Sequence, residues 1–245
     1  MALQEELETQ GNFLFRYRGV LPILILAFGI AAYVDYVMYR GYKDSFSIAY
    51  NVCCLVLTIF GLLIRIYTVG YSAKNTSGRN TEGQLADELN TSGIYSVVRH
   101  PLYVGNFFMW MGIALLSQNI WFITAFIFMY WVYYERIMFA EEQFLRKKFG
   151  NIYLNWAHAT PAFIPRFKNY RKPAAPFNSC KVIRQEKTGM MLVFVLYFIF
   201  DQIHLDVSLK KFSFEYDLWF FAMLASICTY LIIKILQKFT MVLDR

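Results

Sequence analysis

The stretch Gly93-Ile-Tyr-Ser-Val-Val-Arg-His-Pro-Leu-Tyr-Val-Gly105 places a polar, proline-containing turn at the start of an apolar segment. Pro101 suits the first turn of a helix, because its fixed φ is helical and its missing N–H would have no partner there. His100 precedes a proline and is therefore pushed toward an extended conformation. The sequence predicts a helix that begins at Pro101, with Arg99 and His100 at its mouth.

Apolar segments recur along the rest of the chain. Hydrophobic residues make up 58% of the 245 residues and charged residues only 17%, a balance outside the range of ordinary soluble domains. A membrane-spanning helix needs about 20 residues, so we predict an all-α integral membrane protein with about six transmembrane helices. The six candidate segments are Val20–Met38, Ile48–Val69, Leu102–Ser117, Ile120–Tyr134, Gly189–Ile203 and Leu218–Leu236.

The connections between these segments predict the organisation of the chain. Only two polar residues separate the third and fourth segments, which indicates a helical hairpin. Apolar residues at spacings of three to five in Glu135–Trp156 indicate a cytosolic amphipathic helix that leaves the membrane and lies partly on its surface. A basic linker, Arg166–Lys187, then leads to the last two segments. We therefore divide the chain into a membrane core (residues 1–188, with the motifs in 89–165) and a C-terminal pair of transmembrane helices (189–245).

Basic residues gather at one end of the predicted helices. By the positive-inside rule this end is cytoplasmic, which predicts cytoplasmic N- and C-termini and places Arg99 and the Glu141-Glu142 pair on the cytosolic side. The four cysteines show no metal-ligand spacing, so we expect no metal. We expect the lipid bilayer as a partner, and no nucleic acid. Of the 24 Lys and Arg residues, all but five fall at the basic end, the exceptions being Arg40, Lys43, Arg65, Lys210 and Lys211.

Arg99-His100 and Glu141-Glu142 each have an ordinary explanation when taken alone. Basic residues often flank membrane helices, and paired carboxylates often lie on a solvated helix face. Charged groups at a membrane boundary are costly without partners, so two such clusters on one side of consecutive helices favour a shared site. Adjacent helical residues point about 100° apart, so we expect at most one of the two glutamates to turn into a pocket.

The region Leu89–Pro165 resembles a family of membrane methyltransferases that includes isoprenylcysteine carboxyl methyltransferase and the phospholipid methyltransferases. Two ordered motifs carry the resemblance. They are Gly93-x-Tyr95-x-x-x-Arg99-His100-Pro101-x-Tyr103-x-Gly105 and Glu141-Glu142-x-x-Leu145-x-x-x-Phe149-Gly150-x-x-Tyr153, the second being followed by Pro161-x-Phe163-Ile164-Pro165.

This resemblance implies S-adenosylmethionine as the methyl donor, bound at the cytoplasmic ends of these helices. A helix N-terminus suits the carboxylate of this cofactor, and a carboxylate side chain suits its ribose hydroxyls or its amino group. For Gly105, close packing of membrane helices is an equal alternative. The resemblance implies catalytic roles for Arg99 and Glu142, and cofactor binding by Tyr95, His100, Tyr103, Gly105, Glu141 and Glu142.

Arg65 and Arg79 are the candidate substrate-binding residues. An arginine within a span costs roughly 2.5–3.5 kcal/mol on insertion scales, so Arg65 should have a partner, face an aqueous cavity or extend to the nearby membrane surface. We consider binding of an anionic acceptor and pairing with Glu135. An anionic acceptor needs no general base, and the basic surroundings favour an oxygen such as that of a lipid phosphate.

The resemblance implies a membrane lipid as the acceptor, but which lipid stays open at the level of sequence. The loop Lys74–Gln84 resembles bacterial members of the family, including the branch that methylates the 1-phosphate of lipid A, and this makes a bacterial inner membrane the expected location. Carboxyl methylation of isoprenylcysteine and N-methylation of an aminophospholipid are alternatives. An NADPH-dependent sterol-type reductase, which has a longer chain with more spans, and a non-catalytic membrane protein are more distant ones.

Overall fold

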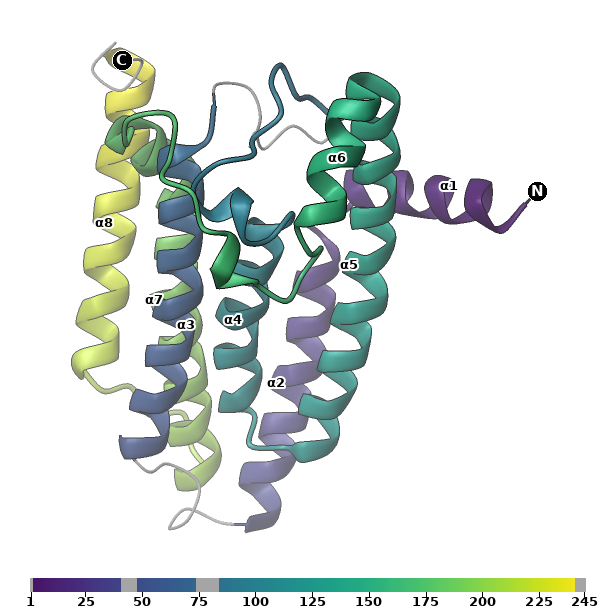
Figure 1. The fold of residues 1–245 in the computed structure, drawn as a ribbon. Coiled ribbons are helices and arrows are strands. Elements are labelled where there is room, and N and C mark those ends of the chain that lie inside the picture. The colour runs from purple at the N-terminus through teal and green to yellow at the C-terminus, as the bar shows by residue number, and fades with distance from the viewer. Residues whose placement is uncertain (1, 41–47, 74–83, 241–245) are drawn as a thin grey trace.

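The computed structural model describes residues 2–40, 48–73 and 84–240, and this part of the chain is helical (Figure 1). Two 3-10 turns, Ile94–Ser96 and Phe167–Asn169, lie in the connections, and a β-bridge joins Gly93 to Arg171. The helices are α1 (Leu3–Arg16), α2 (Leu21–Arg40), α3 (Ile48–Tyr71), α4 (Pro101–Leu116), α5 (Ile120–Phe149), α6 (Asn151–Ala159), α7 (Ser179–Leu209) and α8 (Leu218–Phe239).

Six of these helices, α2 to α5, α7 and α8, run side by side as a bundle (Figure 1). Helix α1 crosses α5 near one end of the bundle, and α6 lies beside the same end of α5. The C-terminal end of α8 and the connection between α3 and α4 also lie at this end of the bundle. The sites of both sequence motifs are therefore at one end of the molecule.

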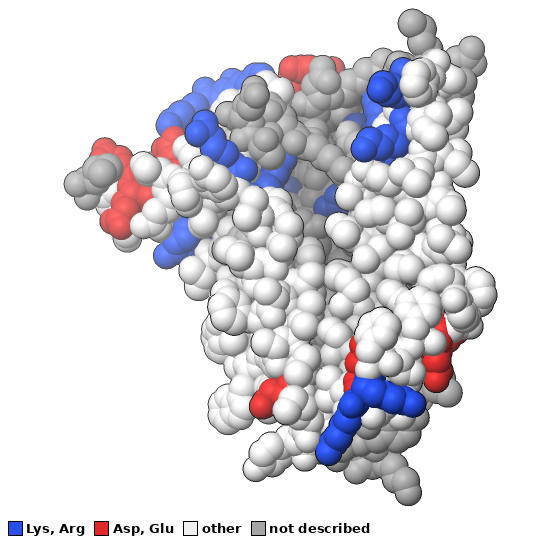
Figure 2. Space-filling model, turned by 180° about the vertical axis from the view of Figure 1, so that it is seen from behind, with Lys and Arg blue, Asp and Glu red and all other residues white. Residues whose placement is uncertain are grey.

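The structure supports an all-helical membrane protein. Among the described residues, four helices are long and apolar enough to cross a membrane: α2, α3, α7 and α8. Helix α4 is apolar but has only 16 residues, and the fourth predicted span is the first half of α5, which continues as a charged helix. Of the six predicted spans, four are thus seen as full-length candidates. Figure 2 shows charged side chains near the two ends of the molecule and an uncharged band between them.

The predicted start of α4 and the predicted hairpin are both confirmed. Helix α4 begins at Pro101, and its N-cap His100 has φ −120° and ψ 60°. The carbonyl of His100 accepts from the N–H groups of Tyr103 and Val104. The turn to α5 ends at Asn119, whose side chain caps α5 by accepting from the N–H groups of its first turn.

The prediction of one amphipathic helix over Glu135–Trp156 was wrong at Gly150. This residue has φ 54° and ψ −128°, a conformation that glycine adopts far more readily than other residues and that ends α5, and its N–H donates to the carbonyl of Arg146. The chain then turns back as α6, which lies beside α5 (Figure 1). The turn brings the two halves of the second motif together on one side of α5.

Helix α7 begins ten residues before the predicted span, at Ser179, where the side chain of Asn178 accepts from the N–H of Lys181. The Lys181 ammonium donates to the Ser72 carbonyl, the Ser72 hydroxyl and the Ala73 carbonyl, and so binds the C-terminal end of α3. The proposed boundary between residues 188 and 189 therefore lies within a continuous helix.

Helices α3 and α4 pack closely through glycines. A Cβ at Gly61 would lie 2.4 Å from the Met109 nitrogen and 2.5 Å from the Gly105 oxygen. A Cβ at Gly105 would lie 2.7 Å from Cγ of Arg65. Small residues let membrane helices approach in this way, and here they bring Arg65 against the first turns of α4.

Candidate active site

The backbone of the first motif is held by the segment that follows α6. The N–H of Arg99 donates to the carbonyl of Pro161 (2.8 Å), and that of His100 donates to the carbonyl of Ala162 (3.2 Å). In return, the N–H of Arg166 donates to the carbonyl of Val97 (2.9 Å). These bonds satisfy the polar groups at the mouth of α4 and fix both motifs relative to each other.

His100 lies between the two glutamates of α5. Its Nε2 is 2.9 Å from Oε1 of Glu142, and its Nδ1 is 3.5 Å from Oε2 of Glu141. The Tyr103 hydroxyl donates to Oε1 of Glu141 at 2.6 Å. Burial alone would lower the pKa of His100, but its hydrogen bonds to the glutamates and their negative charges raise this pKa above its ordinary value.

Arg99 completes the cluster. Its Nε lies 3.0 Å from Oε1 of Glu142 without the alignment of a hydrogen bond, and its Nη1 donates to the carbonyl of Ala157 at 2.8 Å. Burial would raise the pKa of Glu142, but the hydrogen bond to His100 and the charges of His100 and Arg99 lower it below its ordinary value. The carboxylate is therefore stabilised in its ionised form.

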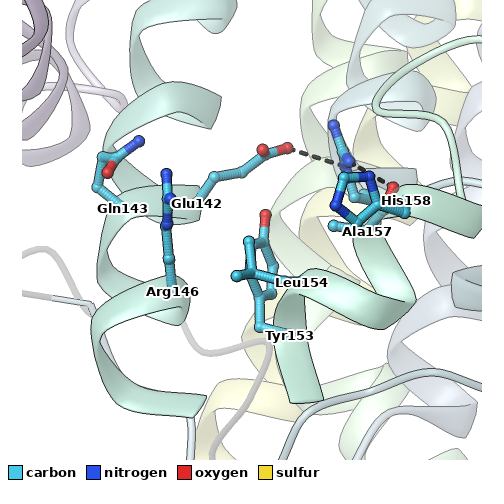
Figure 3. A pocket seen from close by; sticks show the side chains of 8 residues that line it. Glu142, Gln143, Arg146, Tyr153, Leu154, Ala157 and His158 are labelled. Atoms are coloured by element: carbon cyan, nitrogen blue, oxygen red, sulfur yellow. Dashed lines mark hydrogen bonds and ion pairs between the residues drawn. The ribbon is translucent and has the colours of Figure 1, made fainter. Parts of the chain in front are cut away.

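A cavity of about 210 Å³ opens beside Glu142, between α5 and α6 (Figure 3). The Tyr153 hydroxyl points toward the Glu142 carboxylate (Figure 3), is buried and makes no hydrogen bond to a described residue. Glu142 lines this cavity, whereas Glu141 points to Tyr103 instead. The lining residues are Arg99, Glu142, Gln143, Arg146, Tyr153, Leu154, Ala157 and His158.

Five of the predicted site residues thus meet in one cluster: Arg99, His100, Tyr103, Glu141 and Glu142. Tyr95 is close enough to feel the charge of this cluster. Its pKa is raised first by burial and then by the negative charge of Glu141. Gly105 contacts α3 and Arg65, which agrees with the packing alternative for this residue. Arg79 lies outside the described residues. The cavity-lining residues Arg146 and His158 were not predicted, although both lie within or next to the second motif.

Arg65 pairs with a glutamate that the sequence did not single out. Its Nε donates to Oε2 of Glu186 at 2.9 Å, and its Nη2 donates to Oε1 at 2.7 Å. Pairing with Glu135 was therefore wrong, since Glu135 pairs with its neighbour Arg136 at 3.0 Å. The early start of α7 is the reason, because it carries Glu186 as part of a helix beside α3. The sequence did contain a signal for this pair. Arg65 lies within one predicted span without an assigned partner, and Glu186 lies just before another predicted span.

Comparisons with known proteins agree with the motifs. Residues 49–152 match the model of the phospholipid methyltransferase family. The cobalt-zinc-cadmium resistance protein CzcN of Cupriavidus metallidurans is 33% identical over 119 residues, which are 48% of this chain and 52% of that protein. The protein-S-isoprenylcysteine O-methyltransferase of Saccharomyces cerevisiae is 28% identical over 127 residues, 49% of this chain and 52% of the yeast enzyme.

A further relative is the protein-S-isoprenylcysteine O-methyltransferase of Xenopus laevis, which is 29% identical over 137 residues, 53% of this chain and 46% of that enzyme. The chain spans about half the length of these curated relatives. No solved structure matches it. The matched segment contains His100, Glu141 and Glu142. Residues 49–152 are therefore similar to the phospholipid methyltransferase family, and the relatives place isoprenylcysteine methyltransferases among the proteins that this segment resembles.

Proposed function

We propose that the protein transfers a methyl group from S-adenosylmethionine to an acceptor carried by a membrane lipid, at the cytoplasmic face. The observation that carries this proposal is the convergence of the two motifs on His100, which contacts both Glu141 and Glu142 beside a cavity. The family match of residues 49–152 supports the same reaction. Basic side chains at the end of the bundle that holds the site (Figure 2) support its cytoplasmic position.

The groups around the cavity fit the chemistry of this cofactor. Its ammonium group and ribose hydroxyls can donate to carboxylates, which Glu141 and Glu142 supply. Its carboxylate needs cationic donors, and Arg146 lines the cavity without an ion pair to any described carboxylate. The buried Tyr153 hydroxyl lacks a hydrogen-bond partner among the described residues and can serve a ligand, whereas Arg99 Nε already faces the Glu142 carboxylate. When bound, S-adenosylmethionine supplies an electrophilic methyl group on a sulfonium.

The roles of the protein side chains follow from their contacts. His100 holds the Glu142 carboxylate and Tyr103 holds the Glu141 carboxylate, so each is oriented by a second side chain before a ligand binds. Arg99 and His100 keep Glu142 ionised. Since methyl transfer is a direct displacement, such a site contributes mainly by aligning the acceptor with the methyl group and excluding water.

For the acceptor, we propose an anionic oxygen of the lipid A 1-phosphate type as the first to test. Arg146 and His158 beside the cavity support an anionic group. Arg65 does not, because Glu186 already occupies its guanidinium. Carboxyl methylation of isoprenylcysteine is the main alternative and is supported by the names of the relatives. N-methylation of an aminophospholipid is supported by the name of the matched family.

The proposal is tested by incubating the purified protein with methyl-labelled S-adenosylmethionine and lipid extracts that include lipid A. We expect mass spectrometry to find a labelled phosphate methyl ester, with no product from Glu142→Ala and a normal amount from Glu135→Gln. If parallel reactions give a labelled prenylcysteine or a labelled N-methylated lipid instead, the protein is still a methyltransferase but its acceptor is not a lipid phosphate. Oxidation of NADPH without any labelled product would reject the proposal.

A further inference from the structure

A second charged network lies beside the His100 cluster. Arg65 of α3 and Glu186 of α7 form a two-pronged ion pair, with N···O distances of 2.9 and 2.7 Å. Glu186 is only 1% exposed, so water cannot replace Arg65 as its partner. Glu186 also lies outside residues 49–152, the segment that matches the methyltransferase family.

This network continues from the ion pair toward the motif residues. The third nitrogen of Arg65, Nη1, donates to Oδ1 of Asn106 at 2.6 Å. The Asn106 amide donates to the Tyr134 hydroxyl at 3.4 Å, and the Tyr134 ring lies 4.8 Å from the Tyr103 ring, centroid to centroid. The Tyr103 hydroxyl in turn donates to Glu141. A continuous set of contacts thus joins α7 to the paired glutamates through α3, α4 and α5.

We propose that Glu186 is a positioning residue of the methyltransferase site: it fixes Arg65, which through Asn106, Tyr134 and Tyr103 fixes the carboxylate of Glu141. The inference rests on the proposed function. Glu186 accepts from Nε and Nη2, which form one edge of the Arg65 guanidinium, so the remaining nitrogen Nη1 is directed to Asn106. Helix α7, which follows the family segment, thereby contributes to the geometry of a site whose cavity it does not line.

Glu186 also controls where the Arg65 charge is directed. A buried guanidinium without a counter-ion is strongly destabilised and moves toward the nearest carboxylate. The charges of Arg65 and Glu141 both reach the Tyr95 hydroxyl, whose pKa Glu141 raises and Arg65 lowers, so the two charged groups lie in the same region of the site. Without Glu186, Arg65 is expected to be drawn toward Glu141 and to compete with Tyr103 and His100 for it.

A purely structural ion pair between α3 and α7 is the alternative. Replacing both members of a buried pair by apolar residues often preserves stability, whereas removing one member does not. The double variant Arg65→Met/Glu186→Met therefore separates packing from positioning. Asn106→Ala is a second probe, because it interrupts the contacts and leaves the ion pair intact. Glu135→Gln, which removes an exposed ion pair at the surface of α5, is the matched control.

The experiment compares these full-length variants in detergent by thermal unfolding, by calorimetry with S-adenosylhomocysteine and by NMR titration of ¹³C-labelled histidine. In the double variant we expect a nearly unchanged unfolding temperature, affinity reduced roughly tenfold and a lower titration midpoint for His100. Asn106→Ala should lose affinity to a similar extent, and Glu135→Gln should match the wild type. Normal affinity and a normal His100 midpoint in the double variant or in Asn106→Ala would overturn the inference.

These measurements also separate the inference from the proposed function. If the wild type does not bind S-adenosylhomocysteine, the proposed function fails. The His100 titration then decides on positioning alone, since it reports the placement of Glu141 and Glu142 without a ligand. A lower midpoint in Asn106→Ala and in the double variant would support positioning, and an unchanged midpoint would refute it.

Discussion

Nε2 of His100 lies 2.9 Å from Oε1 of Glu142, although the two residues are 42 positions apart in the chain. This contact joins the N-terminal mouth of α4 to the extension of α5 beyond its apolar half. It requires the hairpin between these helices and the backbone bonds that fix residues 97–100 to residues 161–166. The site therefore forms only when this end of the bundle is folded, because the fold brings the side chains of the two motifs into contact.

The His100–Glu142 contact predicts a specific pH dependence of stability. Because the pKa of His100 is raised in the fold from its ordinary 6.5, its contribution is complete below pH 6.5 and is lost as the pH rises through the raised value. The pKa of Glu142 is lowered from 4.5, so its contribution is complete above pH 4.5 and is lost as the pH falls through the lowered value. Both contributions are complete between these two pH values.

Thermal unfolding of wild type and His100→Gln across this range measures the effect. The difference in unfolding temperature should be largest between pH 4.5 and 6.5 and should decline at more alkaline pH. His158→Gln, which removes a histidine without an ion pair to a described glutamate, is the control, and the part of the pH profile that it does not share is assigned to His100. A difference that grows from pH 6 to alkaline pH would contradict the assignment.

Tyr103→Phe tests whether the orientation of Glu141 matters for binding. The change removes the 2.6 Å hydrogen bond to Glu141 and keeps the ring that stacks on His100. Loss of a hydrogen bond to a charged group should weaken binding of S-adenosylhomocysteine roughly tenfold. Tyr67→Phe removes a hydroxyl that bonds to Tyr170 at an exposed position and should bind normally. Equal affinities of the two variants would speak against a role for Glu141.

Glu186→Ala should be among the most destabilising single substitutions in the chain. It leaves the Arg65 guanidinium buried without a counter-ion, which costs about 3–5 kcal/mol of unfolding free energy. Glu135→Ala removes an exposed pair and should cost about 1 kcal/mol or less. Reversible denaturation in mixed micelles measures both, and the account is wrong if the two costs are similar.

Gly61→Ala tests the close approach of α3 and α4. The added Cβ would meet backbone atoms of α4 at 2.4 and 2.5 Å, so the helices must separate. Overpacking of this kind costs about 1–3 kcal/mol and should also weaken cofactor binding, because it displaces the start of α4. Gly19→Ala has no neighbouring atom within 4 Å and should be neutral. Wild-type stability and binding in Gly61→Ala would disprove this role of the glycine.

The features that follow from local rules could be predicted from the sequence. Pro101 predicts the first turn of α4 because proline is favoured there, and the polar residues after Leu116 predict the hairpin. The cost of charged groups at a membrane boundary indicated that Arg99-His100 and Glu141-Glu142 belong together. These rules brought together four of the five clustered residues, whereas Tyr103 was implied only by the resemblance to the methyltransferase family.

Features that depend on distant partners could not be predicted. The residues around Lys181 and Glu186 have the composition of a polar linker. They become part of α7 because Arg65 of α3 and Ser72, just after α3, provide their partners. The end of α5 depends on the positive φ of Gly150, which a helix-like pattern of apolar residues does not reveal. Both features shape the site, since one fixes Arg65 and the other forms the cavity.

Calorimetry with S-adenosylhomocysteine tests the central claim most directly. The account predicts that the wild type and Glu135→Gln bind it, and that His100→Ala and Glu142→Ala do not, while all four proteins unfold cooperatively. Absence of binding to the wild type, or unchanged binding to both site variants, would contradict the claim that the His100–Glu142 cluster holds the methyl donor.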